Sequence, residues 1–264
     1  MKIGFIGCGN MATAILKGIL KSSEVAATDI IASAKSDKTR EKIGKELGIQ
    51  KADTNAQVVD FADVVFLAVK PQFLEEVLDE IKDNVKEGQI FISIAPGKTL
   101  QWLGEHLGEG TKIIRTMPNT PAMVGEGMTA LCVNEQVTEQ ETLLAVTLCN
   151  TFGKTEVIPE HLMDAVVGVS GSSPAYVFMF LEAMADAAVA DGMPRAQAYK
   201  FAAQAVLGSA KLMLETGKHP GELKDMVCSP AGTTIQAVRV LEEKGLRSAV
   251  IEAQLECVKK AKGM

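Results

Sequence analysis

The fold of this chain is decided by residues 1–17, which read MKIGFIGCGNMATAILK. Residues 2–6 form a short apolar run that predicts a buried strand, and the pattern of an amphipathic helix follows it. Between them lies Gly7-x-Gly9-x-x-Ala12, a glycine turn that joins strand to helix. Such turns are common by themselves, but one placed between a strand and a helix is much more specific.

The turn has the spacing of a dinucleotide-binding fingerprint, with alanine in the third small-residue position. Gly7 permits the tight turn, Gly9 lets the backbone approach a pyrophosphate, and Ala12 allows the helix to pack closely on the strand. The N–H groups at the start of the helix then face an anion. A turn that binds nothing is the alternative, and the strand–turn–helix context argues against it.

Composition and charge place the chain among ordinary globular proteins. Of its 264 residues, 47% are hydrophobic and 23% are charged, and the formal net charge is −6. The length favours about two domains, and the acidic balance gives no support to nucleic-acid binding. The five cysteines contain no C-x-x-C pair, which argues against a disulfide framework or a metal site and favours a reducing, cytoplasmic setting. The longest uncharged stretch, residues 165–181, contains glycines, serines and a proline, so we expect no membrane span.

A second strand is predicted over residues 29–33, and its end bears on the choice of cofactor. An NAD-preferring site normally places a carboxylate there, but Asp29 lies at the start of this strand, on the wrong edge of the sheet. The strand instead ends in Ser33, followed by Lys35 and Ser36, two hydroxyls and a cation that suit a 2′-phosphate. A solvated turn with Asp37 as the helix N-cap is the alternative. These residues favour NADPH as the preferred cofactor, with NADH as a second one.

Further strands and helices alternate up to about residue 158. The pattern predicts an N-terminal Rossmann-type domain over residues 1–159, with a doubly wound, mainly parallel sheet. Lys70 and the loop Pro118–Pro121 lie at the carboxyl ends of two strands, the edge at which such sheets bind ligands, although a lone lysine there is often only solvated. The expected strands cover residues 62–70, 89–94, 112–117, 129–133 and 155–158, and the expected helices cover residues 100–106 and 139–150.

The character of the chain changes after residue 159, where strand patterns end and helices follow. The predicted helix 175–190 is apolar nearly all round, with Glu182 and Asp186 as its only charges. We therefore expect residues 160–264 to form an all-α domain that completes its core against a second copy of the chain, the alternative being a bundle sealed within a monomer. The further expected helices cover residues 195–215, 222–227, 233–243 and 246–262.

Catalytic patterns are few. The three histidines occur in no metal or triad spacing. Residues 170–173 resemble part of a β-hydroxyacid dehydrogenase loop, but no lysine follows before Lys200. This argues against alcohol oxidation with lysine as the base and leaves a reduction that needs little acid–base help.

The whole chain resembles the pyrroline-5-carboxylate reductase family. The matching stretches, of which the last is highly specific, are residues 4–11, 68–72, 117–121, 170–176 and 219–234. The resemblance implies NAD(P)H-dependent reduction of (S)-1-pyrroline-5-carboxylate to L-proline, the last step of proline biosynthesis. It also implies dimers formed by the helical domain, often arranged as decamers. Ser173 and Ala231 stand where the family usually has glycine, which puts substrate affinity in question.

The resemblance also implies which residues form the site. The segment Ser229–Thr234 opens a helix and offers N–H groups and hydroxyls to a carboxylate, although Thr233 or Thr234 is also a candidate N-cap. We expect Ser229, Gly232 and Thr233 to hold the substrate carboxylate with help from Ser172, and Thr234 to contact the ring nitrogen as the catalytic residue. The expected cofactor-binding residues are Gly7, Cys8, Gly9, Asn10, Met11, Ser33, Lys35, Asn55, Ala68, Val69, Lys70, Pro71, Asn119 and Pro121.

Two other functions stay open at this point. One is a different enzyme of the same fold, such as a related imine reductase or a β-hydroxyacid dehydrogenase. The other is a non-catalytic nucleotide-binding protein. Turnover of a substrate panel would distinguish another enzyme of this fold from a pyrroline-5-carboxylate reductase. Cofactor binding without turnover would identify a nucleotide-binding protein.

Overall fold

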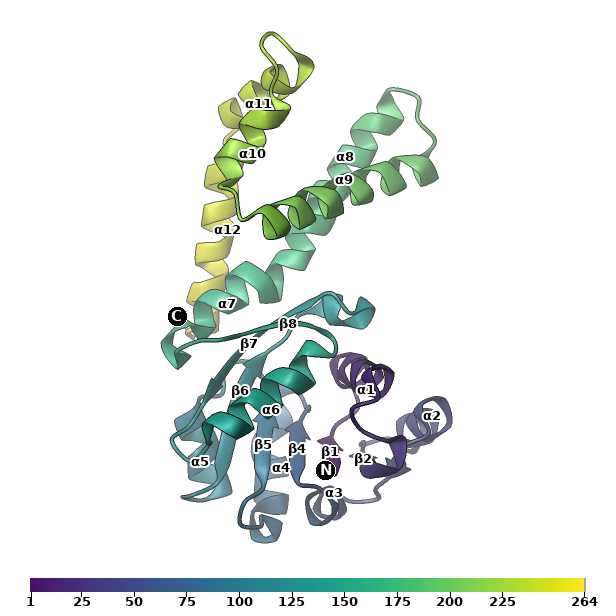
Figure 1. Ribbon diagram of the computed structural model, residues 1–264, viewed down its shortest axis with the longest axis vertical. Helices are drawn as coiled ribbons and strands as arrows, with labels where there is room; N and C mark the ends of the chain where they lie inside the picture. Colours follow the sequence, from purple (N-terminus) through teal and green to yellow (C-terminus); the bar gives the residue numbers. More distant parts are fainter. Residues whose placement is uncertain (264) are drawn as a thin grey trace. The chain divides into compact units, whose positions relative to one another are not determined.

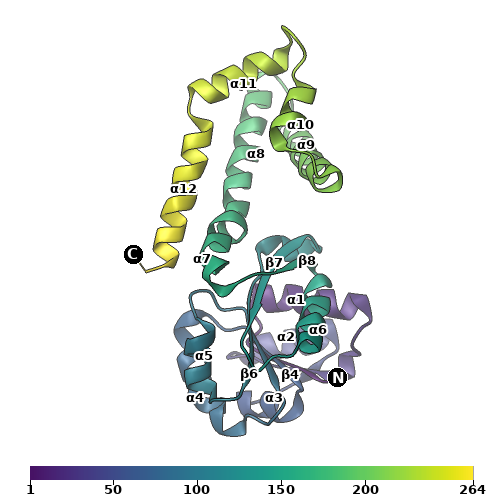
Figure 2. The same ribbon diagram turned by 60° about the vertical axis from the view of Figure 1, so that its left-hand side comes forward.

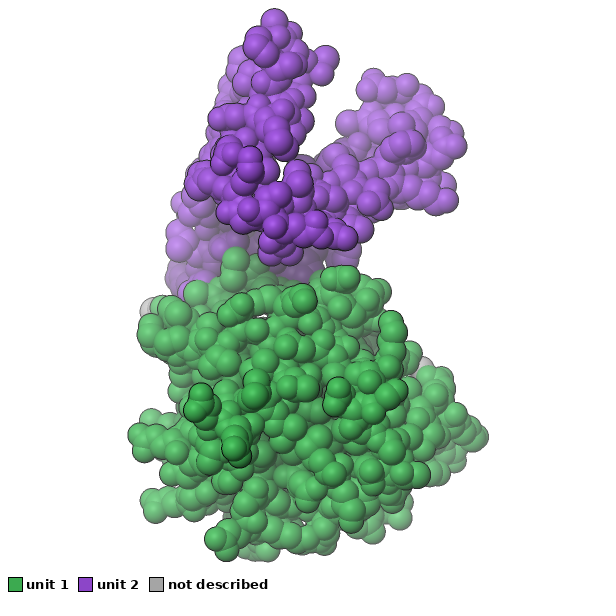
Figure 3. All heavy atoms as spheres, viewed as in Figure 1, with its two compact units in different colours: residues 1–171, 260–264 green, residues 172–259 purple. Residues whose placement is uncertain are grey.

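The computed structural model describes residues 1–263, except for the side chains of Asp37 and Lys42. The chain forms two compact units, one of residues 1–171 with 260–264 and one of residues 172–259 (Figure 3). The domain boundary predicted after residue 159 stays a prediction.

The first unit is built on an eight-stranded sheet with the order β3-β2-β1-β4-β5-β6-β7-β8 (Figure 1). Neighbouring strands are parallel except for β6 and β7, which are antiparallel. The strand order reverses at β1, which pairs with β2 on one side and β4 on the other. This confirms the predicted Rossmann-type, mainly parallel sheet. The strands are β1 Ile3–Ile6, β2 Ile30–Ser33, β3 Gln50–Lys51, β4 Val64–Leu67, β5 Ile90–Ser93, β6 Lys112–Met117, β7 Gly127–Val133 and β8 Gly153–Val157.

Helices cover both faces of this sheet. Figure 2 shows α1, α2 and α6 on one side and α3, α4 and α5 on the other, and each face has its own cluster of buried hydrophobic residues. The central strands β1, β2, β4 and β5 are buried along their whole length, as apolar strands covered on both faces must be. The helices are α1 Asn10–Ser22, α2 Asp37–Leu47, α3 Asn55–Phe61, α4 Leu74–Ile81, α5 Leu100–Leu107, α6 Glu139–Asn150 and α7 Met163–Val166. Short 3-10 helices are η1 Ala27–Asp29, η2 Pro71–Phe73, η3 Lys82–Asn84, η4 Thr120–Val124 and η5 Glu160–Leu162, and a π-helix, η6, covers Val167–Ser172.

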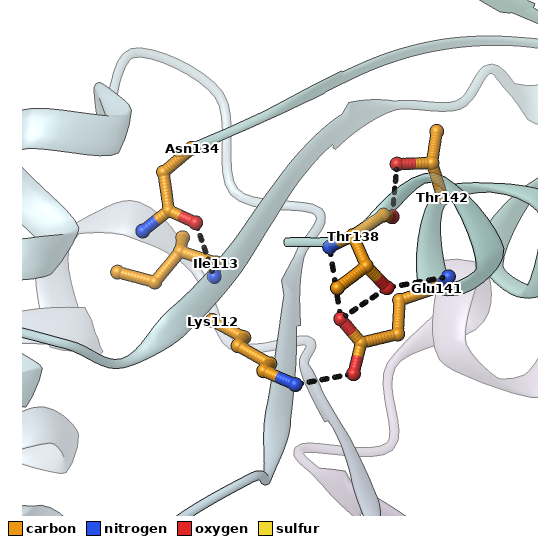
Figure 4. A network of polar contacts seen from close by, with 6 residues as sticks. All are labelled: Lys112, Ile113, Asn134, Thr138, Glu141 and Thr142. Atoms are coloured by element: carbon orange, nitrogen blue, oxygen red, sulfur yellow. Dashed lines mark hydrogen bonds and ion pairs between the residues drawn. The ribbon is translucent and has the colours of Figure 1, made fainter. Parts of the chain in front are cut away.

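A polar network fixes α6 to the strands beside it (Figure 4). Thr138 and Glu141 form a capping box, in which the Glu141 N–H donates to Thr138 Oγ1 at 3.3 Å and the Thr138 N–H donates to Glu141 Oε2 at 2.9 Å. Lys112 of β6 pairs with the same carboxylate. Asn134 Oδ1 accepts from the N–H of Ile113 at 3.1 Å, beside the end of β7. The network therefore holds β6 in place, and the end of β6 leads into a predicted cofactor loop.

The second unit consists of helices that bury almost no core of their own. Within its described residues, the buried hydrophobic side chains are Ala185, Ala198 and Ala202. Large apolar side chains are exposed instead: Phe178 is 65% exposed and Leu214 is 84% exposed. One chain therefore does not seal these helices, which a monomeric bundle would require. They are α8 Ser173–Ala190, α9 Arg195–Thr216, α10 Pro220–Val227, α11 Thr233–Glu243 and α12 Leu246–Ala261.

One continuous helical stretch, Glu160–Ala190, is long and apolar enough to cross a membrane by length and composition. Only 6% of its apolar window is buried within the chain. Length and composition are weak evidence for a span, because an apolar face that a second subunit covers passes the same test.

Candidate active site

The glycine turn after β1 is packed as closely as its motif requires. Gly7 has a φ of +95°, which favours glycine, and its N–H donates to the carbonyl of Ser33 at 3.1 Å. A Cβ at Gly7 would lie 2.7 Å from the carbonyl oxygen of Ala68. The turn is thus held between the ends of β2 and β4, at the point of the sheet where the strand order reverses and ligands bind.

The start of α1 is open to an anion. Gly9 is the N-cap of α1, and no side chain of the described residues caps this helix. A Cβ at Gly9 would meet nothing within 4 Å, so a ligand can approach the backbone at this residue, where the first N–H groups of the helix, those of Asn10 and Met11 among them, lack acceptors within the helix. Burial raises the pKa of the neighbouring Cys8 thiol to about 12, so this side chain stays uncharged beside a bound phosphate at neutral pH. This arrangement fits a dinucleotide pyrophosphate.

The residues after β4 divide into two kinds. Ala68 donates its N–H to the carbonyl of Ile6 at 2.8 Å, and Val69 lies 2.9 Å from the position of a Cβ at Gly7, so both form a wall of the turn. Lys70 is exposed and precedes η2, which Pro71 opens. Lys70 is therefore free to reach solvent or a ligand.

A cavity of about 320 Å³ adjoins the turn. Among the predicted cofactor residues, Gly7, Ser33, Lys35, Asn55 and Val69 line it. The ammonium of Lys35 lies 5.0 Å from the centre of the Phe73 ring, a cation–π contact that holds this charge at the cavity.

The same cavity has charged residues that no sequence pattern indicated. Arg40 adds a second cation, and its Nη1 donates to the carbonyl of Ala34 at 2.9 Å. Carboxylates come from Asp53, Glu76 and Glu80. Since Glu76 and Glu80 belong to α4, only the tertiary packing of that helix reveals them.

The alternative interpretation made Asp37 the N-cap of the helix after β2, which was wrong, because Asp37 is already the first residue of α2. Ser36 is the N-cap, and its Oγ accepts from the N–H of Thr39 at 3.3 Å. The side chain of Asp37 lies outside the described residues. Since the Ser36 hydroxyl caps a helix, its availability for a 2′-phosphate is reduced.

Ser33, Asn55 and Glu80 form a hydrogen-bonded chain in the cavity wall. Ser33 Oγ lies 2.6 Å from Asn55 Oδ1, and Asn55 Nδ2 donates to Glu80 Oε2 at 2.7 Å. Ser33 is the last residue of β2, and Asn55 is the first residue of α3, so the chain joins three elements.

Asn119, predicted to bind the cofactor, uses both ends of its side chain inside the protein. Its Nδ2 donates to the carbonyl of Ser170 at 3.1 Å, and its Oδ1 accepts from the N–H of Met128 at 2.8 Å. Pro121 lies in η4, which follows this residue. The loop after β6 is thus tied to β7 and to the π-helix η6.

The predicted substrate loop in the second unit contains a tight turn. The N–H of Gly232 donates to the carbonyl of Ser229 at 3.0 Å, with Pro230 at the second turn position. Ala231, at the third, has a φ of +57°, in the left-handed region that favours glycine. A Cβ at Gly232 would lie 2.3 Å from Ser229 Oγ and 3.1 Å from the Ser229 carbonyl oxygen, so a larger residue here would displace the Ser229 hydroxyl.

The turn opens α11 with its backbone donors uncapped. We predicted Thr233 or Thr234 as a candidate N-cap, which was wrong: Gly232 is the N-cap, and no side-chain cap exists among the described residues. The turn ends at Gly232 and α11 begins at Thr233, so both threonines lie inside the helix. Their hydroxyls and the first N–H groups of α11 are therefore available to a carboxylate.

Ser172 lies apart from this loop in sequence, immediately before α8. Its Oγ accepts from the thiol of Cys257 at 3.1 Å. Burial raises the pKa of the nearby Tyr176 hydroxyl, as does its hydrogen bond with Cys257, whereas its contact with Ser172 acts in the opposite direction. Ser172 is thus held by neighbours in its own unit.

No group of three or more His, Cys, Asp or Glu side chains that could hold a metal occurs in the part of the chain that the structure describes.

Comparisons with known proteins agree with this geometry. A family model described as "Pyrroline-5-carboxylate reductase dimerisation" matches residues 160–264, and one described as "NADP oxidoreductase coenzyme F420-dependent" matches residues 2–97. Together with the sheet and the open glycine turn, these matches define an NADP-type oxidoreductase with a helical dimerisation domain. A pyrroline-5-carboxylate reductase of Escherichia coli strain K12 is 55% identical over 260 residues, which cover 98% of this chain and 97% of that relative. The chain belongs to the pyrroline-5-carboxylate reductase family, as the sequence motifs predicted.

Solved structures show the same relationship. A pyrroline-5-carboxylate reductase from Coxiella burnetii superposes with a TM-score of 0.93 at 36% identity, covering 99% of this chain and 97% of that one. The Plasmodium falciparum pyrroline carboxylate reductase, solved with NADP bound, gives a TM-score of 0.90 at 29% identity and covers 100% and 97% of the two chains.

Proposed function

We propose that the chain reduces (S)-1-pyrroline-5-carboxylate to L-proline, with NADPH as the preferred cofactor and NADH as a second one. This is the reductase activity of its family and the last step of proline biosynthesis. The observation that carries the proposal is that α1 and α11 both begin without a side-chain cap, which leaves one anion site in each unit. A dinucleotide pyrophosphate and a substrate carboxylate are the two anions that the reaction requires.

The first unit provides the proposed cofactor site. The N–H groups at the start of α1 hold the pyrophosphate, beside the uncharged thiol of Cys8. Lys35 and Arg40 face the cavity that adjoins Ser33, the position at which dinucleotide folds bind the adenosine ribose. Two cations there support NADPH, and the carboxylates of the same wall temper that preference. The NADP-bound relative from Plasmodium falciparum supports the same assignment.

The second unit provides the proposed substrate loop. Ser229, Gly232 and Thr233 hold the carboxylate through the N–H groups and hydroxyls at the start of α11, and Ser172 assists. The hydroxyl of Thr234 orients the ring nitrogen of the imine. Bound NADPH supplies a hydride. The carbon of the protonated C=N bond accepts that hydride, and the electron pair of the double bond goes to the nitrogen, which keeps its proton and becomes the secondary amine of proline. Because the protonated imine is already electrophilic, positioning contributes much of the rate, about 7–11 kcal/mol at best.

The assembly follows from the exposed apolar helices. We propose a homodimer through residues 160–264, arranged further as a decamer, working in the cytoplasm without nucleic acid or membrane. The dimerisation family model supports the dimer, and the exposed side chains of α8 and α9 provide its surface.

Steady-state kinetics with the purified chain tests the function. Oxidation of NADPH, followed by its absorbance, should start when pyrroline-5-carboxylate is added and should yield proline. Other cyclic imines and β-hydroxyacids serve as the comparison panel. A higher kcat/KM for any of them would assign a different reductase, and cofactor binding without turnover would indicate a nucleotide-binding protein.

A further inference from the structure

We propose that Glu80 limits the preference for NADPH over NADH by fixing the direction of the hydrogen bond between Ser33 and Asn55. The proposal rests on the adenosine site of the proposed function. Glu80 belongs to α4 and not to the nucleotide-binding turn, and it acts through Ser33 and Asn55, which line the same cavity.

The direction of each hydrogen bond follows from the chemistry of the groups. An ionised carboxylate only accepts, so the amide nitrogen of Asn55 must face Glu80, to which it donates at 2.7 Å. The amide oxygen of Asn55 then faces Ser33, at 2.6 Å. Since an amide oxygen cannot donate, the hydroxyl hydrogen of Ser33 must point to Asn55.

Glu80 accepts two hydrogen bonds from Asn55, which fixes the orientation of the amide. Its Oε1 also accepts from the backbone N–H of Asn55 at 3.4 Å. That N–H is the first of helix α3 and has no acceptor within the helix, so it favours a negative group beside it. Turning the Asn55 amide over would place its oxygen against the Glu80 carboxylate.

The fixed direction matters for the ligand because Ser33 ends β2, where dinucleotide folds bind the 2′ position of the adenosine ribose. With its hydrogen committed to Asn55, the Ser33 hydroxyl offers only lone pairs to the cavity. A ribose 2′-hydroxyl can donate to them, as in NADH. A 2′-phosphate accepts hydrogen bonds and gains nothing from them unless Ser33 releases Asn55.

The negative charge of Glu80 would by itself disfavour a 2′-phosphate. Glu76 allows this effect of charge to be separated from the effect of hydrogen-bond direction. Glu76 lies one turn before Glu80 on α4, lines the same cavity and is exposed like Glu80. Within the described residues it has no hydrogen bond to Ser33 or Asn55. Glu76→Gln therefore removes one negative charge from the wall and leaves the hydrogen-bonded chain intact.

The experiment measures dissociation constants of NADPH and NADH by calorimetry for the wild type, Glu80→Gln and Glu76→Gln. A glutamine at position 80 can face Asn55 with either its oxygen or its nitrogen, so Asn55 can turn over and Ser33 can donate to a 2′-phosphate. We expect Glu80→Gln to shift the NADPH/NADH affinity ratio toward NADPH by about three- to tenfold, the usual worth of one hydrogen bond. Glu76→Gln should shift the ratio by less than half as much.

A second pair of variants tests whether Glu80 acts through Ser33. In a Ser33→Ala background, Glu80→Gln should shift the affinity ratio no more than Glu76→Gln does, because the hydroxyl that it frees is gone. Equal shifts of the affinity ratio for the two glutamine variants in the wild-type background would overturn the proposal and indicate an effect of charge alone. A shift toward NADH in Glu80→Gln, or no shift, would also overturn the proposal. These affinities need no substrate, so absence of pyrroline-5-carboxylate turnover would refute the proposed function and leave this test standing.

Discussion

Asn119 and Ser170 are joined by a hydrogen bond of 3.1 Å from the side-chain amide of one to the carbonyl of the other. The amide oxygen of Asn119 accepts at 2.8 Å from the N–H of Met128, and Asn119 is only 8% exposed. A residue chosen from sequence as a cofactor ligand is thus also an internal tie between the loop after β6, strand β7 and the π-helix η6. π-Helical turns are frequent at functional sites, and this one ends at Ser172, a predicted substrate residue.

The first prediction tests that tie. Asn119→Asp keeps the shape and the acceptor but removes the donor to Ser170 and places a second acceptor against its carbonyl. We expect the variant to lose about 1–3 kcal/mol of stability, measured by denaturant unfolding. Thr120→Ala, at an exposed position of the same loop, should change stability by less than about 0.5 kcal/mol. Unchanged stability of Asn119→Asp with weaker NADPH binding would mean that its side chain serves the cofactor instead.

The second prediction concerns the cation at the proposed 2′-phosphate site. Lys35→Ala removes a charge held over Phe73 at the cavity, so the KM for NADPH should rise about three- to tenfold and the KM for NADH much less. Lys38→Ala, an exposed lysine that does not line this cavity, provides the control in the same steady-state assay. If Lys35→Ala raised both constants equally, the phosphate would be held by other groups, with Arg40 the next to test.

The third prediction uses the strained alanine of the substrate turn. Ala231→Gly should raise stability by about 0.5–1 kcal/mol, because glycine adopts the φ of +57° without the steric cost that a Cβ carries. Ser173→Gly, the other departure from the usual glycines, should lower stability slightly, because Ser173 is the first residue of α8. Thermal unfolding of both variants, compared with the wild type, shows whether each substitution raises or lowers the stability. A destabilised Ala231→Gly would show that the alanine side chain makes a contact worth more than the strain.

The fourth prediction concerns assembly. Phe178 is 65% exposed on α8 in one chain, so sedimentation at micromolar concentration should show no species near the 28.1 kDa chain mass. Phe178→Asp should release such a species, whereas Met123→Asp, an equally exposed apolar position in the first unit, should not. A wild-type monomer would contradict the proposed dimer.

The sequence predicted most of the fold because the strands and helices of the first unit carry strong local patterns. Residues 112–117 and 139–150 were bounded correctly. Two β-branched isoleucines and the proline that follows residue 117 mark the strand, and a capping box marks the helix. Strand β3 and helix α3 were missed. β3 has only two residues, and α3 has seven, too few for either period to stand out.

The site was predictable where one segment builds it and unpredictable where tertiary packing does. The glycine turn and the loop Ser229–Thr234 are local, and their backbone donors could be inferred from residue order. Glu80 reaches Asn55 only because α4 packs beside the start of α3, and no spacing in the sequence expresses that contact. The same applies to Asn119, whose motif indicates the cofactor but not its bond to Ser170.

The last prediction concerns Thr234, the second residue of α11, whose hydroxyl caps no helix and is half-buried. We expect it to orient the ring nitrogen of the substrate. A neutral hydroxyl is a weak acid, so it is not an essential proton source, but it can accept from the protonated imine and from the product amine. Removing the contact should cost about 1–3 kcal/mol, or roughly ten- to a hundredfold in kcat/KM.

Thr234→Ala should therefore be impaired yet active, with the dissociation constant of NADPH nearly unchanged, and Thr234→Ser should recover much of the loss. Thr233→Ala is the matched control, because its hydroxyl is assigned to the carboxylate: it should raise the KM for substrate more than it lowers kcat. Steady-state kinetics at saturating NADPH measures both. Gly232 is the N-cap of α11, so a loss of kcat/KM in Thr234→Ala cannot be attributed to a lost helix cap. Wild-type kcat/KM in this variant would remove Thr234 from the mechanism. A parallel loss of NADPH affinity would mean instead that the hydroxyl contacts the cofactor.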